Sequence, residues 1–145
     1  LQEVRANTED IPKEGLNPGN LSGIFYPAQR KGYAGCALYV KTTPDHVQHG
    51  FGWSEADQEG RYVRADWGPL SVISVYVPSG SSSEDRQAAK YRFMDRFYPV
   101  LAKIHRSGRH VVLCGDWNIA HTEKDLKFTG HIADCTECIN ISDVH

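Results

Sequence analysis

The residues of this sequence whose types and spacing could do hydrolytic chemistry are Asp116 and Asn118. They stand one residue apart, directly after the apolar run Val111–Cys114 and Gly115. The run is too short for a helix and β-branched enough for a buried strand, and Gly115 would permit a sharp exit from it. At a strand's carboxyl end, Asp116 could accept a proton from water or hold a hard cation, while the Asn118 amide orients the ligand. The alternative is an Asx turn, in which both side chains bond backbone groups.

The length and the net charge of the chain limit the classes of protein to which it can belong. The chain has 145 residues, enough for one domain with a real core, and a formal net charge of −2. No global basic field therefore indicates nucleic acid, and any contact with a polyanion must come from a local patch. No apolar stretch approaches membrane-spanning length, and no signal peptide is recognisable. The chain begins at Leu1 rather than Met, which led us to expect a fragment of a longer protein.

The four cysteines, Cys36, Cys114, Cys135 and Cys138, do not form a regular disulfide framework. We expect Cys36 and Cys114 to be core positions in strands, all four thiols to be free, and the protein to be cytoplasmic. Cys135 and Cys138 with His131 could also hold Zn²⁺, although no second matched pair of ligands supports that alternative.

The elements that must position Asp116 and Asn118 follow from the hydrophobic pattern. Residues 1–3 read as the end of a strand, and the next thirty, rich in Asn, Pro and Gly, as a long loop. A strand is predicted over residues 34–41. Residues 61–67 and 70–77 predict an antiparallel hairpin around Gly68-Pro69.

A helix is predicted between this hairpin and the strand that begins at Val111. Ser81 and Glu84 match a capping box, and Pro99 should kink or divide the helix. Apolar residues recur at helical spacing and are predicted to be core: Met94, Phe97, Tyr98, Leu101 and Ile104.

Four segments carry a resemblance to a known family. They are residues 1–3 (Leu-Gln-Glu), 32–38 (Gly-Tyr-Ala-Gly-Cys-Ala-Leu), 75–80 (Val-Tyr-Val-Pro-Ser-Gly) and 114–126 (Cys-Gly-Asp-Trp-Asn-Ile-Ala-His-Thr-Glu-Lys-Asp-Leu). In order and spacing they resemble the exodeoxyribonuclease III family of apurinic/apyrimidinic endonucleases, within the endonuclease/exonuclease/phosphatase superfamily. The resemblance covers residues 1–127 and implies a partial domain there, with an unrecognised tail over 128–145. It implies a four-layer α/β sandwich, incomplete and mostly its N-terminal half.

The resemblance also implies a role for each matched residue. Glu3 corresponds to a glutamate that holds Mg²⁺ or Mn²⁺, and Tyr76 to an active-site tyrosine near the scissile phosphate. Asp116 corresponds to the aspartate that activates water, and Asn118 to the asparagine that orients the phosphate, with both near the metal. Phosphodiester hydrolysis needs these groups: a cation, a base for water, and donors to the phosphoryl oxygens.

The partner implied by the resemblance is double-stranded DNA with abasic sites or 3′ ends, bound by a monomer. Arg5 is expected near a phosphate, Ser79 at a position that touches the DNA backbone, and Arg30 and Lys31 in a loop beside the site. Other basic residues could bind phosphates but more often belong to a solvated helix face: Arg61, Arg64, Arg86, Lys90, Arg92 and Arg96.

The function implied is a metal-dependent DNA repair nuclease that cleaves at abasic sites and degrades 3′ ends. The family's additional metal-binding Asn and its Asp-His pair have no counterpart here, so we expect these 145 residues alone to be nearly inactive. The alternatives are a non-catalytic remnant, a nucleic-acid-binding module, or a superfamily relative acting on RNA or phosphoinositides.

Overall fold

The computed structural model of the protein describes residues 1–80 and 82–119. These residues form helices and strands in the following order: η1 (Thr8–Asp10), α1 (Lys13–Leu16), β1 (Ser22–Tyr26), β2 (Cys36–Val40), β3 (His46–His49), α2 (Ser54–Asp57), β4 (Tyr62–Trp67), β5 (Leu70–Tyr76), α3 (Glu84–Arg106) and β6 (His110–Asp116).

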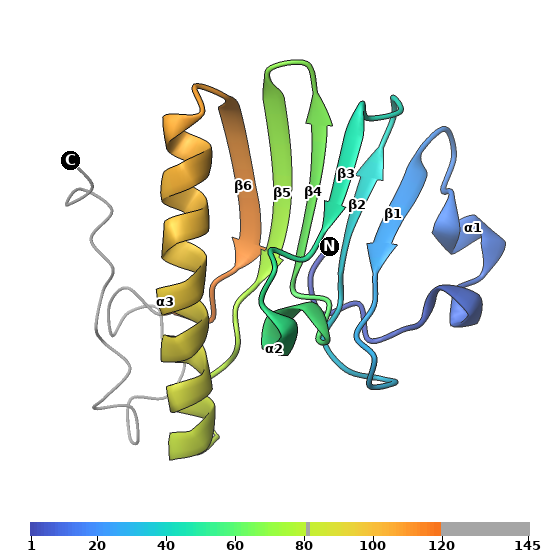
Figure 1. The fold of residues 1–145 in the computed structure, drawn as a ribbon. Helices are drawn as coiled ribbons and strands as arrows, with labels where there is room; N and C mark the ends of the chain where they lie inside the picture. Colours follow the sequence, from blue (N-terminus) through green and yellow to red (C-terminus); the bar gives the residue numbers. More distant parts are fainter. Residues whose placement is uncertain (81, 120–145) are drawn as a thin grey trace.

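The strands form two sheets, one of four strands in the order β3-β4-β5-β6 and one of two strands, β1-β2 (Figure 1). The predicted hairpin is present, because β4 and β5 pair antiparallel. The chain then crosses over through α3 and returns as β6, which lies parallel to β5. Parallel neighbours end at the same edge of a sheet. As predicted, the fold is of the α/β class and has two sheets.

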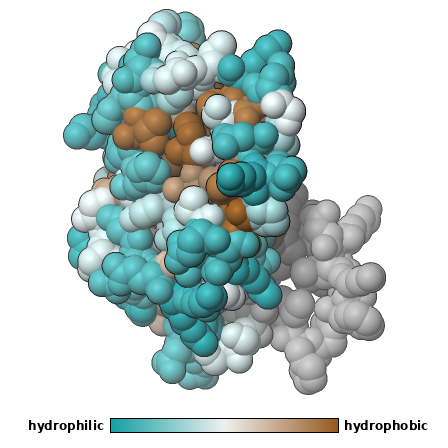
Figure 2. Space-filling view, turned by 90° about the vertical axis from the view of Figure 1, so that its right-hand side faces the viewer, coloured by the Kyte–Doolittle hydropathy of each residue, from teal (hydrophilic) through white to brown (hydrophobic). Residues whose placement is uncertain are grey.

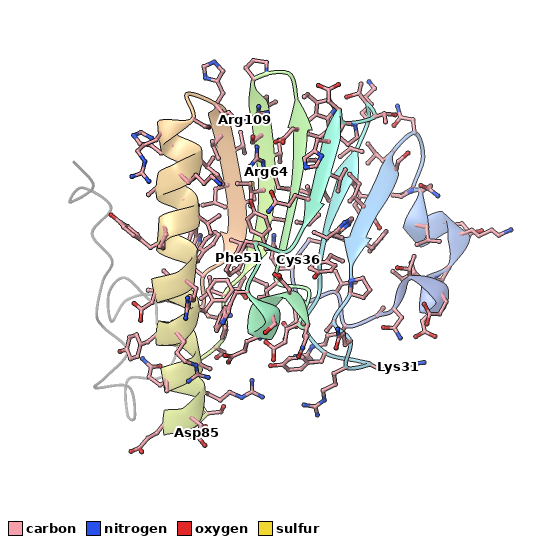
Figure 3. All side chains as sticks on the ribbon, in the orientation of Figure 1. Lys31, Cys36, Phe51, Arg64, Asp85 and Arg109 are labelled. Atoms are coloured by element: carbon pink, nitrogen blue, oxygen red, sulfur yellow. The ribbon has the colours of Figure 1, made fainter. Side chains whose placement is uncertain are left out.

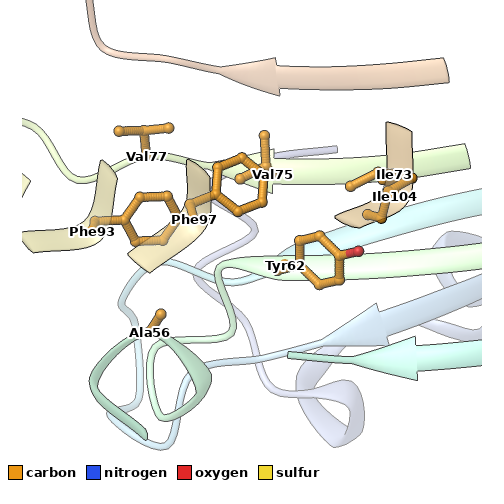
Figure 4. Packing of buried hydrophobic residues seen from close by; sticks show 8 residues of the cluster. All are labelled: Ala56, Tyr62, Ile73, Val75, Val77, Phe93, Phe97 and Ile104. Atoms are coloured by element: carbon orange, nitrogen blue, oxygen red, sulfur yellow. The ribbon is translucent and has the colours of Figure 1, made fainter. Parts of the chain in front are cut away.

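One hydrophobic core lies between α3 and the four-stranded sheet (Figure 4). The apolar stripe of α3 supplies Phe93, Phe97 and Ile104, which pack against side chains of β4 and β5. The prediction that Tyr98 is core is wrong, because Tyr98 is 50% exposed. It neighbours Phe97 in sequence but points about 100° away around the helix.

Two further predictions about α3 are also corrected. Its N-cap is Ser83, whose side chain accepts a hydrogen bond from the backbone N–H of Arg86, so the helix does not begin with a cap at Ser81. Pro99 does not divide the helix, which continues through it to Arg106. The buried residues on both sides of Pro99 hold the helix to one sheet face, which compensates for the lost backbone bond. Among the described residues no helix is long and apolar enough to cross a membrane.

A second, smaller core lies between the two sheets, where Cys36 of β2 packs with Val63 of β4 and Tyr76 of β5. Residues of β1 and β2 also cover part of the outer surface. Seen from the side of β1, that surface is largely hydrophilic, with apolar residues gathered in its upper half and centre (Figure 2). The inter-sheet core is important for the site because it fixes Tyr76.

The long loop predicted before residue 34 contains β1, and β3 was not predicted. Both strands are short, and each pairs antiparallel with a neighbour, β1 with β2 and β3 with β4. In strands this short, the alternation of apolar and polar residues is too brief to predict them. Their stability depends on the neighbouring strand with which each pairs.

The predicted burial of β6 is wrong, although the strand itself is present. Val111 is 38% and Val112 47% exposed, and Cys114 is also exposed, so Cys114 is not a core position. Leu113 packs against the α3 core, whereas Val112 and Cys114 alternate to the opposite face. On that side β2 packs mainly on β4 and β5, and Val112 and Cys114 are exposed among the described residues.

Candidate functional site

The site is built around the adjacent carboxyl ends of β5 and β6. Tyr76 and Asp116 are register partners, and the backbone N–H of Val77 donates to the Asp116 carbonyl at 2.9 Å. Gly115 permits this close pairing, because a Cβ there would lie 2.5 Å from the carbonyl oxygen of Val75. Gly115 was predicted to allow a sharp exit from the strand, and the structure instead gives it a packing role.

The turn after β6 is closed by the side chains of Asp116 and Asn118. The backbone N–H of Asn118 donates to Asp116 Oδ1 at 2.9 Å, and Asn118 Nδ2 donates to the Val77 carbonyl at 2.8 Å. The Asx turn considered as an alternative is therefore present. It does not exclude chemistry, since Asp116 is exposed and its Oδ2 accepts no hydrogen bond from the described residues.

Lys90 of α3 also contacts this turn. The sequence did not predict this contact, because Lys90 was expected on a solvated face of the helix. Its side chain is buried, and Nζ donates to the backbone carbonyl of Asn118 at 2.7 Å. Asn118 has φ of 50°, the left-handed conformation that Asn adopts more readily than most residues other than Gly, and the contact with Lys90 helps to fix it. The helical spacing of Lys90 with Phe93 and Phe97 was the signal that it faces the core.

Glu3 reaches the site from the other end of the chain. Leu1 exchanges hydrogen bonds with Ala37 of β2, and Arg5 N–H donates to the carbonyl of Ala34 at 2.8 Å. Between these anchors Glu3 has φ of 54° and Arg5 has φ of 52°. Backbone strain of this kind persists only where surrounding contacts fix it, and it clusters at functional sites.

The carboxylate of Glu3 lies between a cation and a phenol. Arg5 forms an ion pair with it through Nη2 and donates from Nε at 3.1 Å, and the Tyr76 hydroxyl is also hydrogen-bonded to it. The bonds from Arg5 and then Tyr76 hold the pKa of Glu3 below its usual range, so the carboxylate is ionised at neutral pH. The structure thus brings Glu3, Tyr76 and Asp116 together.

Tyr76 is buried, and its surroundings set the ionisation of its phenol. Burial raises its pKa, and the negative charges of Glu3 and Asp116 raise it further, while the nearby Arg61 guanidinium lowers it. At neutral pH the phenol is therefore protonated and can donate a hydrogen bond to a carboxylate or to a phosphoryl oxygen.

The four residues predicted to contact DNA lie in different environments. Arg5 is paired with Glu3, and the Arg30 guanidinium lies over the ring of Tyr33 at 5.3 Å. Lys31, at the outer end of the β1–β2 loop (Figure 3), forms an exposed ion pair with Asp10 at 3.1 Å. Ser79 is exposed just after β5. All four are on the surface.

A divalent cation would find oxygen donors here but not a complete cage. Within residues 1–80 and 82–119 no group of three or more His, Cys, Asp or Glu side chains could hold a metal. The donors present are the carboxylates of Glu3 and Asp116 and the amide oxygen of Asn118, which is available because Nδ2 is the donor to Val77. Oxygen donors of this kind suit a hard divalent cation, which can also bind waters and phosphates.

The remaining residues singled out from the sequence lie outside the described part of the chain. They are the capping candidate Ser81 and, in the tail, His131, Cys135 and Cys138. The domain boundary at residue 127 and the zinc alternative stay predictions.

Comparison with known proteins gives a consistent result. Residues 1–136 match the endonuclease/exonuclease/phosphatase family. The chain is 34% identical over 127 residues to an exodeoxyribonuclease of Bacillus subtilis (strain 168), covering 88% of this chain and 49% of that protein. It is 30% identical over 130 residues to a DNA-(apurinic or apyrimidinic site) endonuclease of Dictyostelium discoideum, covering 88% and 35%. A solved structure of an AP endonuclease from Archaeoglobus fulgidus superposes with a TM-score of 0.71 at 27% identity, covering 84% and 47%. The chain spans less than half the length of each of these relatives.

Proposed function

Since the chain belongs to the endonuclease/exonuclease/phosphatase family, we propose that it forms part of a DNA repair nuclease that hydrolyses phosphodiester bonds with a divalent cation. The family is a class of metal-dependent nucleases, and the resemblance predicted from the sequence is confirmed at this level. The relatives named above are DNA nucleases. Because this chain spans less than half of their length, the activity of the whole protein is a proposal.

One observation carries the proposal. The phenol of Tyr76 is flanked by two carboxylates that come from distant parts of the chain, Glu3 from the N-terminal segment and Asp116 from the end of β6. A phenol and two carboxylates at one edge of the sheet together offer a hydrogen-bond donor and oxygen ligands. Such an arrangement is expected where the charges serve a ligand.

The reaction that these residues support is attack of water on a phosphodiester. Asp116 Oδ2 would accept the proton of the attacking water, and the Tyr76 hydroxyl and the Asn118 amide would contact the phosphoryl oxygens. Glu3, Asp116 and Asn118 would hold Mg²⁺ or Mn²⁺, which offsets the charge that develops on the phosphate. Lys90 would keep the Asp116–Asn118 turn in place during turnover.

The proposed substrate is double-stranded DNA with abasic sites or 3′ ends, acted on by a cytoplasmic monomer. The names of the relatives support the DNA substrate. The exposed basic residues Arg30 and Lys31, on the β1–β2 loop, are the proposed phosphate contacts. Their ion-pair and cation–π partners are weak surface contacts that DNA phosphates could replace.

The test is cleavage of a 5′-labelled duplex containing one abasic site by the natural gene product that contains these 145 residues. With Mg²⁺ we expect incision on the 5′ side of the abasic site, and no incision with EDTA or in Asp116→Ala. Asp95→Ala is the matched control, because Asp95 is an exposed aspartate on α3. Incision that persists in Asp116→Ala would remove Asp116 from its role.

The non-catalytic alternative is separated by measuring binding in the same samples. Fluorescence anisotropy that shows tight binding of the abasic duplex without incision would favour a binding module. Incision of RNA or of a phosphoinositide, with the DNA left intact, would favour another branch of the superfamily.

A further inference from the structure

Arg61, the residue immediately before β4, is a buried cation. It is 2% exposed, and each nitrogen of its guanidinium donates a hydrogen bond to a neighbour. Nε donates to Glu59 Oε2 at 2.5 Å, Nη1 to the Tyr76 carbonyl at 2.9 Å and Nη2 to the Tyr33 hydroxyl at 3.3 Å. Burying an arginine costs free energy unless its donors find partners. Arg61 is also inaccessible to DNA, so its role must lie in the contacts that it makes inside the protein.

The contact with Tyr76 completes an interrupted strand pair. The backbone N–H of Tyr76 donates to the Arg61 carbonyl at 2.9 Å, which is one half of an antiparallel hydrogen-bonded pair. The other half is missing, because the Arg61 N–H donates to Ala56 instead, at 3.3 Å. The Arg61 side chain supplies the missing donor to the Tyr76 carbonyl. Both backbone polar groups of Tyr76 are therefore bound by this one residue.

The same guanidinium also lies against the side chain of Tyr76. Its Cζ is 4.8 Å from the centre of the Tyr76 ring and 5.8 Å from that of Tyr33. Tyr33 is held in turn by Arg86, whose Nη1 donates to its hydroxyl at 2.7 Å. A planar cation that contacts two aromatic rings and donates hydrogen bonds in its own plane restricts the tilt of both rings.

From these contacts we infer that Arg61 is a positioning residue, which holds the Tyr76 phenol against Glu3 and toward the scissile phosphate. The inference rests on the proposed function for its consequence in catalysis, but the positioning itself is a property of the folded chain. Lysine could not replace Arg61, because an ammonium is a point charge that cannot serve three directions in one plane.

The kinetic test is a double-mutant cycle with Arg61→Met and Tyr76→Phe on the abasic duplex. Arg61→Met is expected to lower kcat about 10²-fold with little change in KM, since misplacing a reacting group costs about that much. In the Tyr76→Phe background the same change should have almost no further effect, because its target is gone. Arg64→Met is the matched control: Arg64 is in the same region of β4 and ion-paired with Asp66 at 2.7 Å. It should leave kcat within about threefold of the unsubstituted protein.

The second readout does not depend on cleavage. With tyrosines labelled at ¹³Cζ and the Tyr76 signal assigned from Tyr76→Phe, the chemical shift of that signal at neutral pH reports the surroundings of the phenol. The Arg61 guanidinium lies 4.8 Å from the centre of the Tyr76 ring. Arg61→Met should therefore shift the Tyr76 signal, and Arg64→Met should leave it in place. If Arg61→Met does not fold, Arg61→Lys takes its place in the cycle, with a smaller loss of kcat and a shifted Tyr76 signal.

The outcomes separate the two proposals. Independent, multiplying effects of Arg61→Met and Tyr76→Phe, or an unchanged Tyr76 signal in Arg61→Met, would overturn the positioning role. Failure of the unsubstituted protein to cleave DNA would overturn the proposed function, and the NMR signal of Tyr76 would then decide whether Arg61 positions the ring.

Discussion

The hydroxyl of Tyr76 is hydrogen-bonded to the carboxylate of Glu3, which joins the end of β5 to the N-terminal segment. Neither residue is near the other in sequence. The bond depends on the pairing of Leu1 with β2 and on the inter-sheet core that buries the Tyr76 ring. The predictions below follow from this contact and from the turn beside it.

Tyr76→Phe should leave the fold intact and lower kcat on the abasic duplex about 10²–10³-fold, the usual effect of removing one preorganised donor. Phe keeps the ring that packs in the inter-sheet core but lacks the hydroxyl. Tyr98→Phe is the control, because Tyr98 is exposed on α3 and its hydroxyl has no role in the site. Equal rates for the two variants would show that the Tyr76 hydroxyl does not contribute.

Arg5→Met should raise the pKa of the Glu3 carboxyl toward the ordinary value of a glutamate, because the bonds from Arg5 are the largest cause of its depression. A depressed pKa stabilises the fold above the unfolded-state pKa, and this contribution is lost as pH falls through the folded-state pKa. The Arg5–Glu3 pair is exposed, so the effect on stability is small.

The measurement for Arg5→Met is a ¹³C NMR titration of the Glu3 carboxyl, assigned from Glu3→Gln. Arg92→Met is a matched control, since Arg92 forms a similar exposed pair with Glu55 at 2.8 Å. A Glu3 titration that is the same in both variants would contradict the assignment of Arg5 as its partner.

Lys90→Met should reduce the free energy of unfolding by about 1–3 kcal/mol, because it leaves the Asn118 carbonyl without its donor. Met fills a similar volume, so a cavity does not account for the loss. Lys103→Met tests an exposed lysine of the same helix and should stay within about 0.5 kcal/mol. Urea denaturation measures the free energy of unfolding of both variants. Indistinguishable midpoints would show that Lys90 does not stabilise the turn.

The cysteines should all be free thiols, with different reactivities. Burial raises the pKa of Cys36 to about 12, whereas Cys114 is exposed on β6. We expect iodoacetamide to modify Cys114 in the native protein and Cys36 only after unfolding. Peptide mass spectrometry locates the modified residues, and thiol counting in denaturant without reductant should find four thiols per chain, the number of cysteines in the sequence. A count of two would show that a disulfide forms.

The sequence by itself determined the elements whose signals are local. Alternation and the Gly68-Pro69 turn predicted the β4–β5 hairpin, helical spacing predicted α3, and a short apolar run predicted β6. The motif residues Glu3, Tyr76, Asp116 and Asn118 were predicted from the sequence, and the structure places Tyr76 with both carboxylates. Their roles stay predictions, which the variants above test.

Tertiary structure decided which faces are covered and which charges are paired. Val112 has the apolar character of a core residue and is exposed, because β2 packs mainly on β4 and β5. Arg61 and Lys90 were predicted to be surface cations, but both are buried. Each donates a hydrogen bond to a backbone carbonyl, Arg61 to that of Tyr76 and Lys90 to that of Asn118. Residue type records the preference of one side chain for water or for the core, whereas burial and pairing depend on partners that the fold brings from distant parts of the chain.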